Sequence, residues 1–209
     1  LYTEDTYEIE GEPQFGYRRG KYSKAELKEI DAFAAENGIE LIPCIQTLAH
    51  LNAIFRYERY QKINDVADIL LTDDENTYEF IEKMIKTCAE CFTSRNIHIG
   101  MDEAHMLGKG KYYDKHGDKN RFDILLKHLM RVTEILKKYG FKPMMWSDMF
   151  FRLAGGGAYY HDKPIPAEVR EKVPQEMQLV YWDYYHENAE LLDGMIESHL
   201  SFNRPVWIA

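Results

Sequence analysis

The chain of 209 residues carries 26 Lys and Arg against 35 Asp and Glu, a formal net charge of −9. A protein that follows phosphates needs a surplus of basic side chains, so this balance argues against nucleic acid as a partner. Hydrophobic residues make up 45% of the chain and charged residues 29%, which is typical of a globular protein. No apolar run approaches the ~18 residues of a membrane span, so we expect no membrane partner.

Amphipathic helices are expected to alternate with short apolar strands along the chain. Leu1–Thr3 is expected as a strand, and a Ser23–Glu26 capping box opens a helix that ends at Asn37-Gly38. Four apolar residues of this helix recur at helical spacing and are expected to be buried: Leu27, Ile30, Phe33 and Ala34. The next strand is expected at 39–45.

The same alternation continues through the middle of the chain. Residues 72–75 open a second helix, and the strand 96–100 follows it. The inward apolar residues of this helix are Phe80, Ile81, Met84 and Ile85. A third helix ends at Gly140 before the strand 142–146. Its apolar face is formed by Ile124, Leu125, Leu129, Val132 and Leu136.

Two shorter helices, at 167–173 and 189–199, precede strands at 177–182 and 204–209. Strands separated by helices predict a parallel sheet, and both a doubly wound sheet and a (β/α)8 barrel fit this pattern. Because both ends of the chain fall in expected strands, we expect a segment of a longer polypeptide.

Polar and aromatic side chains follow five successive strands. They are Glu4, Asp5, His50, Asp102, Glu103, Trp146, Asp148, Trp182 and Asp183. A barrel brings all its strand ends to one mouth, whereas an open sheet spreads them along an edge, so this pattern favours the barrel. We therefore expect an α/β fold, a (β/α)8 TIM barrel truncated at both ends. Residues 1–209 would be a single partial domain covering about six of its strands.

The densest group of chemically active side chains is His98–His105, of sequence HIGMDEAH. Asp102 and Glu103 repel each other at the end of a buried strand, so one of them should hold a proton near neutral pH, as a general acid must. The residue types alone leave a second interpretation open, in which both are solvated loop acids or cap the next helix.

The pattern His98-x-Gly-x-Asp102-Glu103 resembles the signature of the family 20 glycoside hydrolases, the β-N-acetylhexosaminidases. In that family it closes the fourth strand of a (β/α)8 barrel. Residues 38–50 resemble the family's third strand, which ends in a substrate-site histidine, here His50. Trp146–Phe150 resembles the fifth-strand segment, whose Trp lines the pocket for the acetamido group.

Two more positions agree with the family, and others depart from it. Trp182 stands where the sixth strand has a second pocket Trp, and Glu4 or Asp5 stands where the second strand has a sugar-binding acid. Leu48-Ala49 precedes His50, where the family commonly has Pro-Gly. The family's first-strand Arg, seventh-strand Tyr, and eighth-strand Trp and Glu would lie outside this sequence.

The resemblance implies substrate-assisted hydrolysis with retention, in which the sugar's 2-acetamido oxygen attacks the anomeric carbon and forms an oxazolinium intermediate. Glu103 would protonate the leaving oxygen and later deprotonate the water, while Asp102 would hold the acetamide N–H. Trp146 and Trp182 would enclose the acetyl methyl group. The other substrate-binding residues that we expect are His50, Glu4, Asp5, Asp148 and Tyr184.

We expect an exo-acting enzyme that removes terminal GlcNAc or GalNAc from glycans or glycoconjugates, with no metal or organic cofactor. One alternative is a retaining glycosidase on the same barrel that uses two protein carboxylates, Glu103 and Asp148. Another is a catalytically silent sugar-binding barrel, which would keep the Trp walls and be indifferent to Glu103→Gln.

Four other patterns are interpreted as structural. Asp102–His105 spells a DEAH box, but no phosphate-binding Gly-x-x-x-x-Gly-Lys-Ser/Thr loop accompanies it. Cys88–Cys91 has redox spacing but lies late in an expected helix, which favours core cysteines; three cysteines and no visible signal favour a reducing compartment. His98 and His105 show no closed set of metal ligands. Tyr17–Tyr22 mixes basic and aromatic residues and is interpreted as a loop that contacts the rest of the barrel, with Arg18 or Arg19 reaching the sugar as the alternative.

Overall fold

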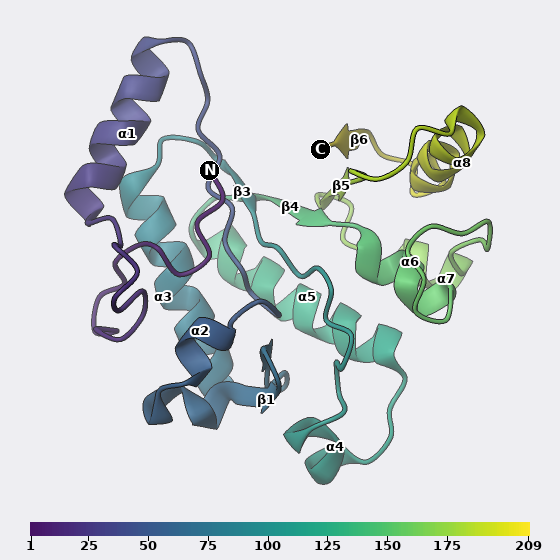
Figure 1. The fold of residues 1–209 in the computed structure, drawn as a ribbon, viewed down its shortest axis with the longest axis horizontal. Coiled ribbons are helices and arrows are strands. Elements are labelled where there is room, and N and C mark those ends of the chain that lie inside the picture. Colours follow the sequence, from purple (N-terminus) through teal and green to yellow (C-terminus); the bar gives the residue numbers. More distant parts are fainter.

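The computed structural model describes residues 1–209, and Figure 1 shows its helices and strands. The α-helices are α1 (Lys24–Glu36), α2 (Asn52–Phe55), α3 (Glu75–Cys91), α4 (Lys111–His116), α5 (Arg121–Lys138), α6 (Asp148–Ala154), α7 (Ala167–Lys172) and α8 (Ala189–Leu200). The strands are β1 (Asn64–Val66), β2 (Ile69–Leu70), β3 (Asn96–His98), β4 (Lys142–Trp146), β5 (Gln178–Tyr181) and β6 (Val206–Ile208). A 3-10 helix at Glu58–Ile63 leads into β1.

The main sheet is parallel and follows the order of the sequence. β3, β4, β5 and β6 pair in that order, each parallel to the next. Two earlier segments extend the sheet through parallel bridges from Tyr2 to Cys44 and from Cys44 to His98. The strand order therefore never reverses, whereas it does reverse in a doubly wound sheet. The predicted parallel α/β arrangement is confirmed.

The predicted strand at 39–45 is reduced to a bridge at Cys44. Pro43 has no N–H to give to a ladder, although its carbonyl accepts the N–H of His98. The N–H of Ile45 donates in turn to the carbonyl of His98. This segment thus stays in the sheet, but it holds fewer hydrogen bonds than an uninterrupted strand would.

The long helices begin and pack largely as predicted. Ser23 caps α1, with its Oγ accepting the Glu26 N–H at 3.2 Å and its own N–H donating to Glu26 Oε2 at 2.7 Å. The predicted inward faces of α3 and α5 are buried along their whole length. In Figure 1, α1, α3 and α5 lie in succession beside the strands, and contacts join α1 to α3 and α3 to α5.

The prediction that Phe33 is buried is wrong, because 67% of its surface is exposed. Helix α1 buries Leu27, Asp31 and Ala34, which lie on one face at positions i, i+4 and i+7. Asp31 belongs to that face because its Oδ2 accepts the N–H of Thr93. The face that packs on α3 is therefore rotated away from Phe33.

The sequence did not predict several short elements that follow the strands. The hairpin β1–β2, α2 and the 3-10 helix lie between the bridge segment and α3, while α4 follows β3 and α6 follows β4. These elements are too short to show a periodic apolar pattern. In Figure 1, α2, β1 and α4 gather at one end of the long helices. The N–H of Tyr112 in α4 donates to Asp65 in β1, which ties two of them together.

The interior is one continuous apolar cluster between the sheet and the helices. Cys44, Cys88 and Cys91 are all free and buried, and burial raises the pKa of each thiol. The interpretation of Cys88 and Cys91 as core cysteines is confirmed. None of the helices combines the length and apolar character that a membrane span requires.

Candidate active site

A cavity of about 460 Å³ lies where the carboxyl ends of the strands meet. It is lined by Tyr2, Asp102, Glu103, Trp146, Trp182, Tyr184 and Tyr185. These residues come from the first bridge segment, from the end of β4 and from the loops after β3 and β5. The sheet thus brings the acidic pair and the aromatic residues of the sequence pattern into one cavity.

The chain leaves β3 through a strained turn that presents both acids to the cavity. Gly100, Met101 and Glu103 all adopt positive φ, at 70°, 72° and 52°. A Cβ on Gly100 would lie 2.2 Å from Gln46 Oε1, so only glycine leaves room for that side chain. Strain of this kind persists where the surrounding contacts hold it, and it is common at functional sites.

Asp102 is held in the charged state by two neighbours. His50 Nε2 lies 3.0 Å from Asp102 Oδ2, and Gln46 donates to Asp102 Oδ1 at 3.0 Å. Burial alone would raise the pKa of Asp102, but the contacts with His50 and Gln46 outweigh it and hold that pKa below its usual value. The contact with Asp102 in turn raises the pKa of His50 to about 9. At neutral pH, this pair is therefore an imidazolium beside a carboxylate.

His50 is fixed from the other side by the β1–β2 hairpin. Its backbone N–H donates to Asp68 Oδ2 at 3.0 Å, and the same oxygen lies 3.9 Å from His50 Nδ1. His50 Nε2 also lies 3.7 Å from Glu103 Oε2. One cationic ring thus lies within reach of both acids of the signature, although His50 itself does not line the cavity.

Glu103 is supported by a buried ion pair. Its N–H donates to Asp148 Oδ2 at 3.0 Å, and its Oε1 accepts a hydrogen bond from Arg152 Nη2 at 3.2 Å. Arg152 Nε also donates to Asp148 Oδ2 at 2.9 Å. Asp148 is fully buried and lies behind Glu103 instead of on the cavity wall. Burial raises the pKa of Asp148 to about 6, against the opposing effects of these hydrogen bonds.

The sequence predicted that one of the adjacent acids holds a proton near neutral pH. Asp102 does not, because its pKa lies below the usual value. The raised pKa belongs to a third carboxyl group, Asp148. That Glu103 holds a proton near neutral pH remains a prediction, which the activity of Glu103→Gln tests.

The aromatic residues form two walls. The ring of Trp146 packs on His98 at 4.3 Å between centroids, and the ring of Trp182 packs on Tyr159 at 5.0 Å. Tyr184 extends the second wall, its ring nearly parallel to Trp182 at 22° and 5.8 Å. Both tryptophans are only partly buried, so they line the cavity and are not plugs of the core.

His98 has a structural position. Its Nδ1 accepts the N–H of Gly100 at 3.1 Å, which requires the neutral ring, and burial lowers its pKa to about 4. Nowhere in the chain do three or more His, Cys, Asp or Glu side chains gather as metal ligands would. His98 therefore supports the turn after β3 and the Trp146 wall.

Glu4 and Asp5 do not reach the cavity. Both pair with Arg19, whose Nη2 lies 2.9 Å from Glu4 Oε2 and whose Nε lies 3.3 Å from Asp5 Oδ1. Tyr2 is the residue of this segment that lines the cavity, and its hydroxyl accepts a hydrogen bond from Gln46 at 2.9 Å. In this segment the cavity is therefore lined by Tyr2 and not by the predicted acids Glu4 and Asp5.

Sequence reasoning missed Tyr2, Gln46, Asp68 and Arg152. Tyr2 lies within the expected strand Leu1–Thr3, and Gln46 directly follows the expected strand 39–45, so their position near a strand end was available as a signal. Arg152 follows Asp148 by four residues, which puts both on one face of α6. Asp68 lies in a hairpin whose pairing no local pattern revealed.

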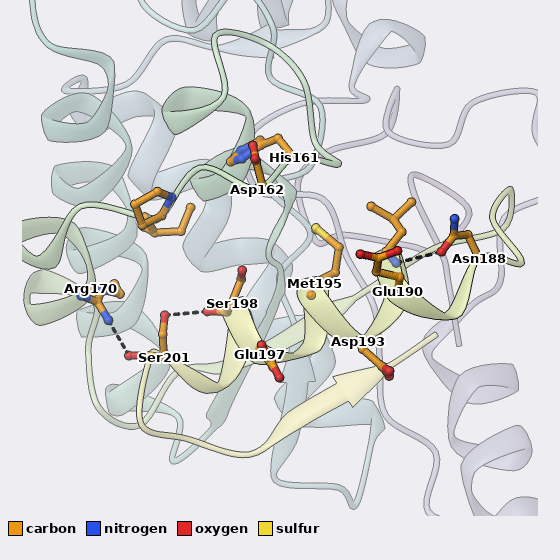
Figure 2. Close-up of a pocket in the computed structure, with 14 residues that line it drawn as sticks. His161, Asp162, Arg170, Asn188, Glu190, Asp193, Met195, Glu197, Ser198 and Ser201 are labelled. Atoms are coloured by element: carbon orange, nitrogen blue, oxygen red, sulfur yellow. Dashed lines mark hydrogen bonds between the residues drawn. The ribbon is translucent and has the colours of Figure 1, made fainter.

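A larger cavity of about 1060 Å³ lies elsewhere, between residues 161–165 and α8. Figure 2 shows its polar lining, including His161, Arg170 and Glu190, with Met195 reaching in from α8. None of the predicted site residues lines it, and neither does the last residue of any strand. The strand-end cavity is therefore the candidate active site.

Residues 3–193 match the family model described as glycosyl hydrolase family 20, catalytic domain. Hexosaminidase D of Bos taurus is 27% identical over 220 residues, covering 99% of this chain and 60% of that protein. Hexosaminidase D of Homo sapiens is 26% identical over 190 residues, covering 87% of this chain and 37% of that protein. The chain thus spans at most 60% of the length of these two relatives.

A solved structure agrees with the family match. The GH20 exo-β-N-acetylglucosaminidase of Vibrio harveyi, in complex with N-acetylglucosamine, has a TM-score of 0.70 with this chain. The likeness covers 99% of this chain and 35% of that one, and at 17% identity it shows a shared fold. With the family match across 3–193, it follows that the chain belongs to glycoside hydrolase family 20.

Proposed function

We propose that the protein is a glycoside hydrolase, an exo-acting β-N-acetylhexosaminidase that hydrolyses terminal β-linked GlcNAc or GalNAc. One observation carries the proposal: Asp102 and Glu103 share a cavity with Trp146 and Trp182, each contributed at the end of a successive strand. The names of the bovine and human relatives support the same activity. The expected partner is a glycan or glycoconjugate with that sugar at its non-reducing end.

The fold proposal follows from the strand order. Residues 1–209 form a single partial catalytic domain, with about six strands of a (β/α)8 barrel. Parallel neighbours in chain order and strand ends that share one cavity support it. In such a barrel the cavity lies at the carboxyl-terminal mouth, where catalytic residues gather.

The chemistry is substrate-assisted and retains the anomeric configuration. The 2-acetamido oxygen attacks the anomeric carbon while Glu103 gives a proton to the glycosidic oxygen, whose bond to the sugar breaks. Water then attacks the oxazolinium ion, and Glu103 takes the proton back. Asp102, ionised beside His50, accepts the acetamide N–H and balances the positive charge of the oxazolinium.

The supporting residues hold these two acids in place. His50 and Gln46 orient Asp102, while Asp148 and Arg152 hold the backbone and the carboxylate of Glu103. We propose Tyr2 and Tyr184 as contacts to the sugar, because both line the cavity. Glu4 and Asp5 pair with Arg19 outside the cavity lining.

The alternative with two protein carboxylates places the nucleophile on Asp148. Its burial opposes this role, because Asp148 is absent from the cavity lining and its Oδ2 already accepts hydrogen bonds from Glu103 and Arg152. A nucleophile must reach the anomeric carbon, and retaining enzymes of that type place their carboxyl groups about 5–5.5 Å apart across the sugar.

The test compares an aryl β-N-acetylglucosaminide with the matching aryl β-glucoside, using the full natural chain. We expect cleavage of the first substrate alone, and a loss of about 10²–10⁴-fold in kcat for Glu103→Gln. Equal cleavage of both substrates would exclude substrate assistance. Cleavage of neither, with retained binding of N-acetylglucosamine, would favour the silent sugar-binding barrel.

A further inference from the structure

A chain of hydrogen bonds runs behind the two tryptophan walls. The N–H of Trp182 meets the hydroxyl of Tyr159 at 3.4 Å, and that hydroxyl lies 3.0 Å from Ser147 Oγ. Ser147 Oγ lies 2.7 Å from His199 Nε2, and His199 Nδ1 lies 2.6 Å from the carbonyl of Met195. These hydrogen bonds thus connect the residue after β4, the loop after α6, the residue after β5 and helix α8.

In each hydrogen bond of this network, the donor and the acceptor can be assigned. A carbonyl only accepts, so His199 Nδ1 carries a hydrogen and Nε2 is left as an acceptor. Ser147 must then donate to His199, and Tyr159 must donate to Ser147. The Tyr159 oxygen accepts the N–H of Trp182, which completes the sequence. This order requires neutral His199, and burial lowers the pKa of that ring to about 4.

Burial excludes a nucleophilic role for this Ser–His pair. Ser147 and His199 have no exposed surface, and neither lines the strand-end cavity. The His199 ring is enclosed by aromatic rings, stacked on Phe151 at 4.4 Å and packed on Tyr181 at 4.9 Å. The Ser147–His199 pair can therefore affect the site only through the residues that it positions.

The residues that this network positions are the two cavity walls, Trp146 and Trp182. Ser147 directly follows Trp146, and Tyr159 contacts both the backbone and the ring of Trp182. The backbone N–H of Ser147 already joins the end of β4 to the carbonyl of Val180 in β5 at 3.0 Å. The hydroxyl of Tyr159 adds a side-chain link from the end of β4 to the loop that carries Trp182. Its removal leaves the Trp182 amide without that partner, while the tyrosine ring continues to pack.

We propose that Tyr159, Ser147 and His199 are positioning residues that fix the distance between Trp146 and Trp182 and thereby set the size of the 2-acylamido group that the enzyme accepts. The inference rests on the proposed function, since it concerns the group that the walls would enclose. It predicts a change in selectivity between acyl groups and not a uniform loss of activity.

The test uses aryl β-glucosaminides that carry an N-acetyl or an N-propionyl group. One methylene in an apolar pocket is worth about 10–200-fold, so the wild type should prefer the acetyl substrate by that factor in kcat/KM. In Tyr159→Phe we expect this preference to fall below about threefold, because the Trp182 wall relaxes outwards. Ser147→Ala, which breaks the chain one step further back, should shift the preference in the same direction.

Tyr78→Phe is the matched control. Tyr78 is also a buried tyrosine whose hydroxyl lies beside a buried histidine, His128 at 3.3 Å, but it contacts neither wall. Its preference for the acetyl substrate should equal that of the wild type. If Tyr159→Phe and Ser147→Ala lose kcat/KM equally on both substrates, the inference is wrong, while the proposed function still stands. A wild type that cleaves neither substrate would overturn the proposed function and the inference with it.

Discussion

The charge on His50 depends on Asp102, whose oxygen lies 3.0 Å from the imidazole Nε2. This contact raises the pKa of His50 to about 9, so the ring stays protonated at neutral pH and loses its proton as pH rises through that value. We expect the kcat/KM of the wild type to fall along an alkaline limb near pH 9. His50→Gln should lose this limb and about ten- to a hundredfold of kcat/KM, the worth of one hydrogen bond to a charged group.

The measurement is a pH–rate profile of both proteins between neutral pH and the alkaline limit of their stability. Free-enzyme groups appear in kcat/KM, so that parameter reports on His50 before substrate binds. An alkaline limb that persists unchanged in His50→Gln would assign it to another group.

Arg152 neutralises the fully buried Asp148, whose Oδ2 lies 2.9 Å from Arg152 Nε. Arg152→Met leaves that carboxylate buried and unpaired, which should cost about 3 kcal/mol of unfolding free energy. Adding Asp148→Asn removes the charge but keeps an oxygen for the N–H of Glu103, so the double variant should recover more than half of the loss. Urea denaturation near pH 8 measures both, and additive losses would contradict the ion-pair account.

The site residues that the sequence revealed share one property, a pattern that reaches beyond a single position. Asp102 and Glu103 lie in a motif, and Trp146 and Trp182 each close an apolar strand; all four line the cavity. The missed residues are single polar side chains, and each has a partner that is distant in the chain: Gln46 contacts Asp102, Asp68 contacts His50, and Arg152 contacts Glu103 as well as the nearby Asp148. Gln46, for example, contacts Asp102 across 56 positions, which no local pattern encodes.

At the scale of elements, the turn after β3 is the feature on which the site depends most. Gly100 and Gly140 both adopt positive φ, at 70° and 71°, so alanine at either position incurs about 1–2 kcal/mol of backbone strain. An added Cβ meets nothing within 4 Å at Gly140, whereas at Gly100 it would lie 2.2 Å from Gln46 Oε1. The two substitutions thus share the strain and differ in the clash.

We expect Gly140→Ala to lower stability modestly and leave turnover unchanged. Gly100→Ala should displace Gln46 from Asp102, lowering kcat at least about tenfold and adding about 1–3 kcal/mol of overpacking. Thermal unfolding and kcat for both variants make the comparison. Equal turnover in the two would mean that Gln46 does not orient Asp102.

Long helices were predicted from the sequence, whereas the shortest elements were not. Helices α3 and α5 were predicted from their apolar periodicity and are confirmed, because each presents several turns of buried side chains. The four-residue α2 and the β1–β2 hairpin were not, because their stability comes from contacts with other segments. Phe33 marks the same limit in α1, where the neighbouring helix decided which face was buried.

In the molecule as a whole, local sequence predicted the alternation of helices and strands, but it did not by itself predict which strands pair. Pairing joins Tyr2 to Cys44 and Cys44 to His98, residues more than forty positions apart. Local sequence sets where a strand forms, while long-range hydrogen bonds set its neighbours. Consecutive βα units usually pair in parallel, and this rule predicted the neighbours of each strand. It also predicted that the residues at the carboxyl ends of the strands lie close together.

Stability against pH follows from groups spread over the whole fold. His98, His128 and His199 are buried, and burial lowers the pKa of each to about 4, from an ordinary value of 6.5. Between those values the unfolded chain binds these protons and the folded chain does not, so stability falls as pH drops from 6.5 to 4. Two carboxyl groups oppose this fall in part, because burial raises the pKa of Asp148 to about 6 and also raises the pKa of Asp65.

His50 acts on the other side of neutrality. Its pKa is raised to about 9, so its stabilising contribution is complete below 6.5 and is lost as pH rises through 9. We therefore expect the melting temperature of the wild type to be highest near pH 6.5 and to fall in both directions. His50→Gln should flatten the alkaline side and leave the acid side unchanged, because the buried histidines are untouched. A melting temperature that rises between pH 6.5 and 9 in the wild type would contradict the charged pairing of His50 with Asp102.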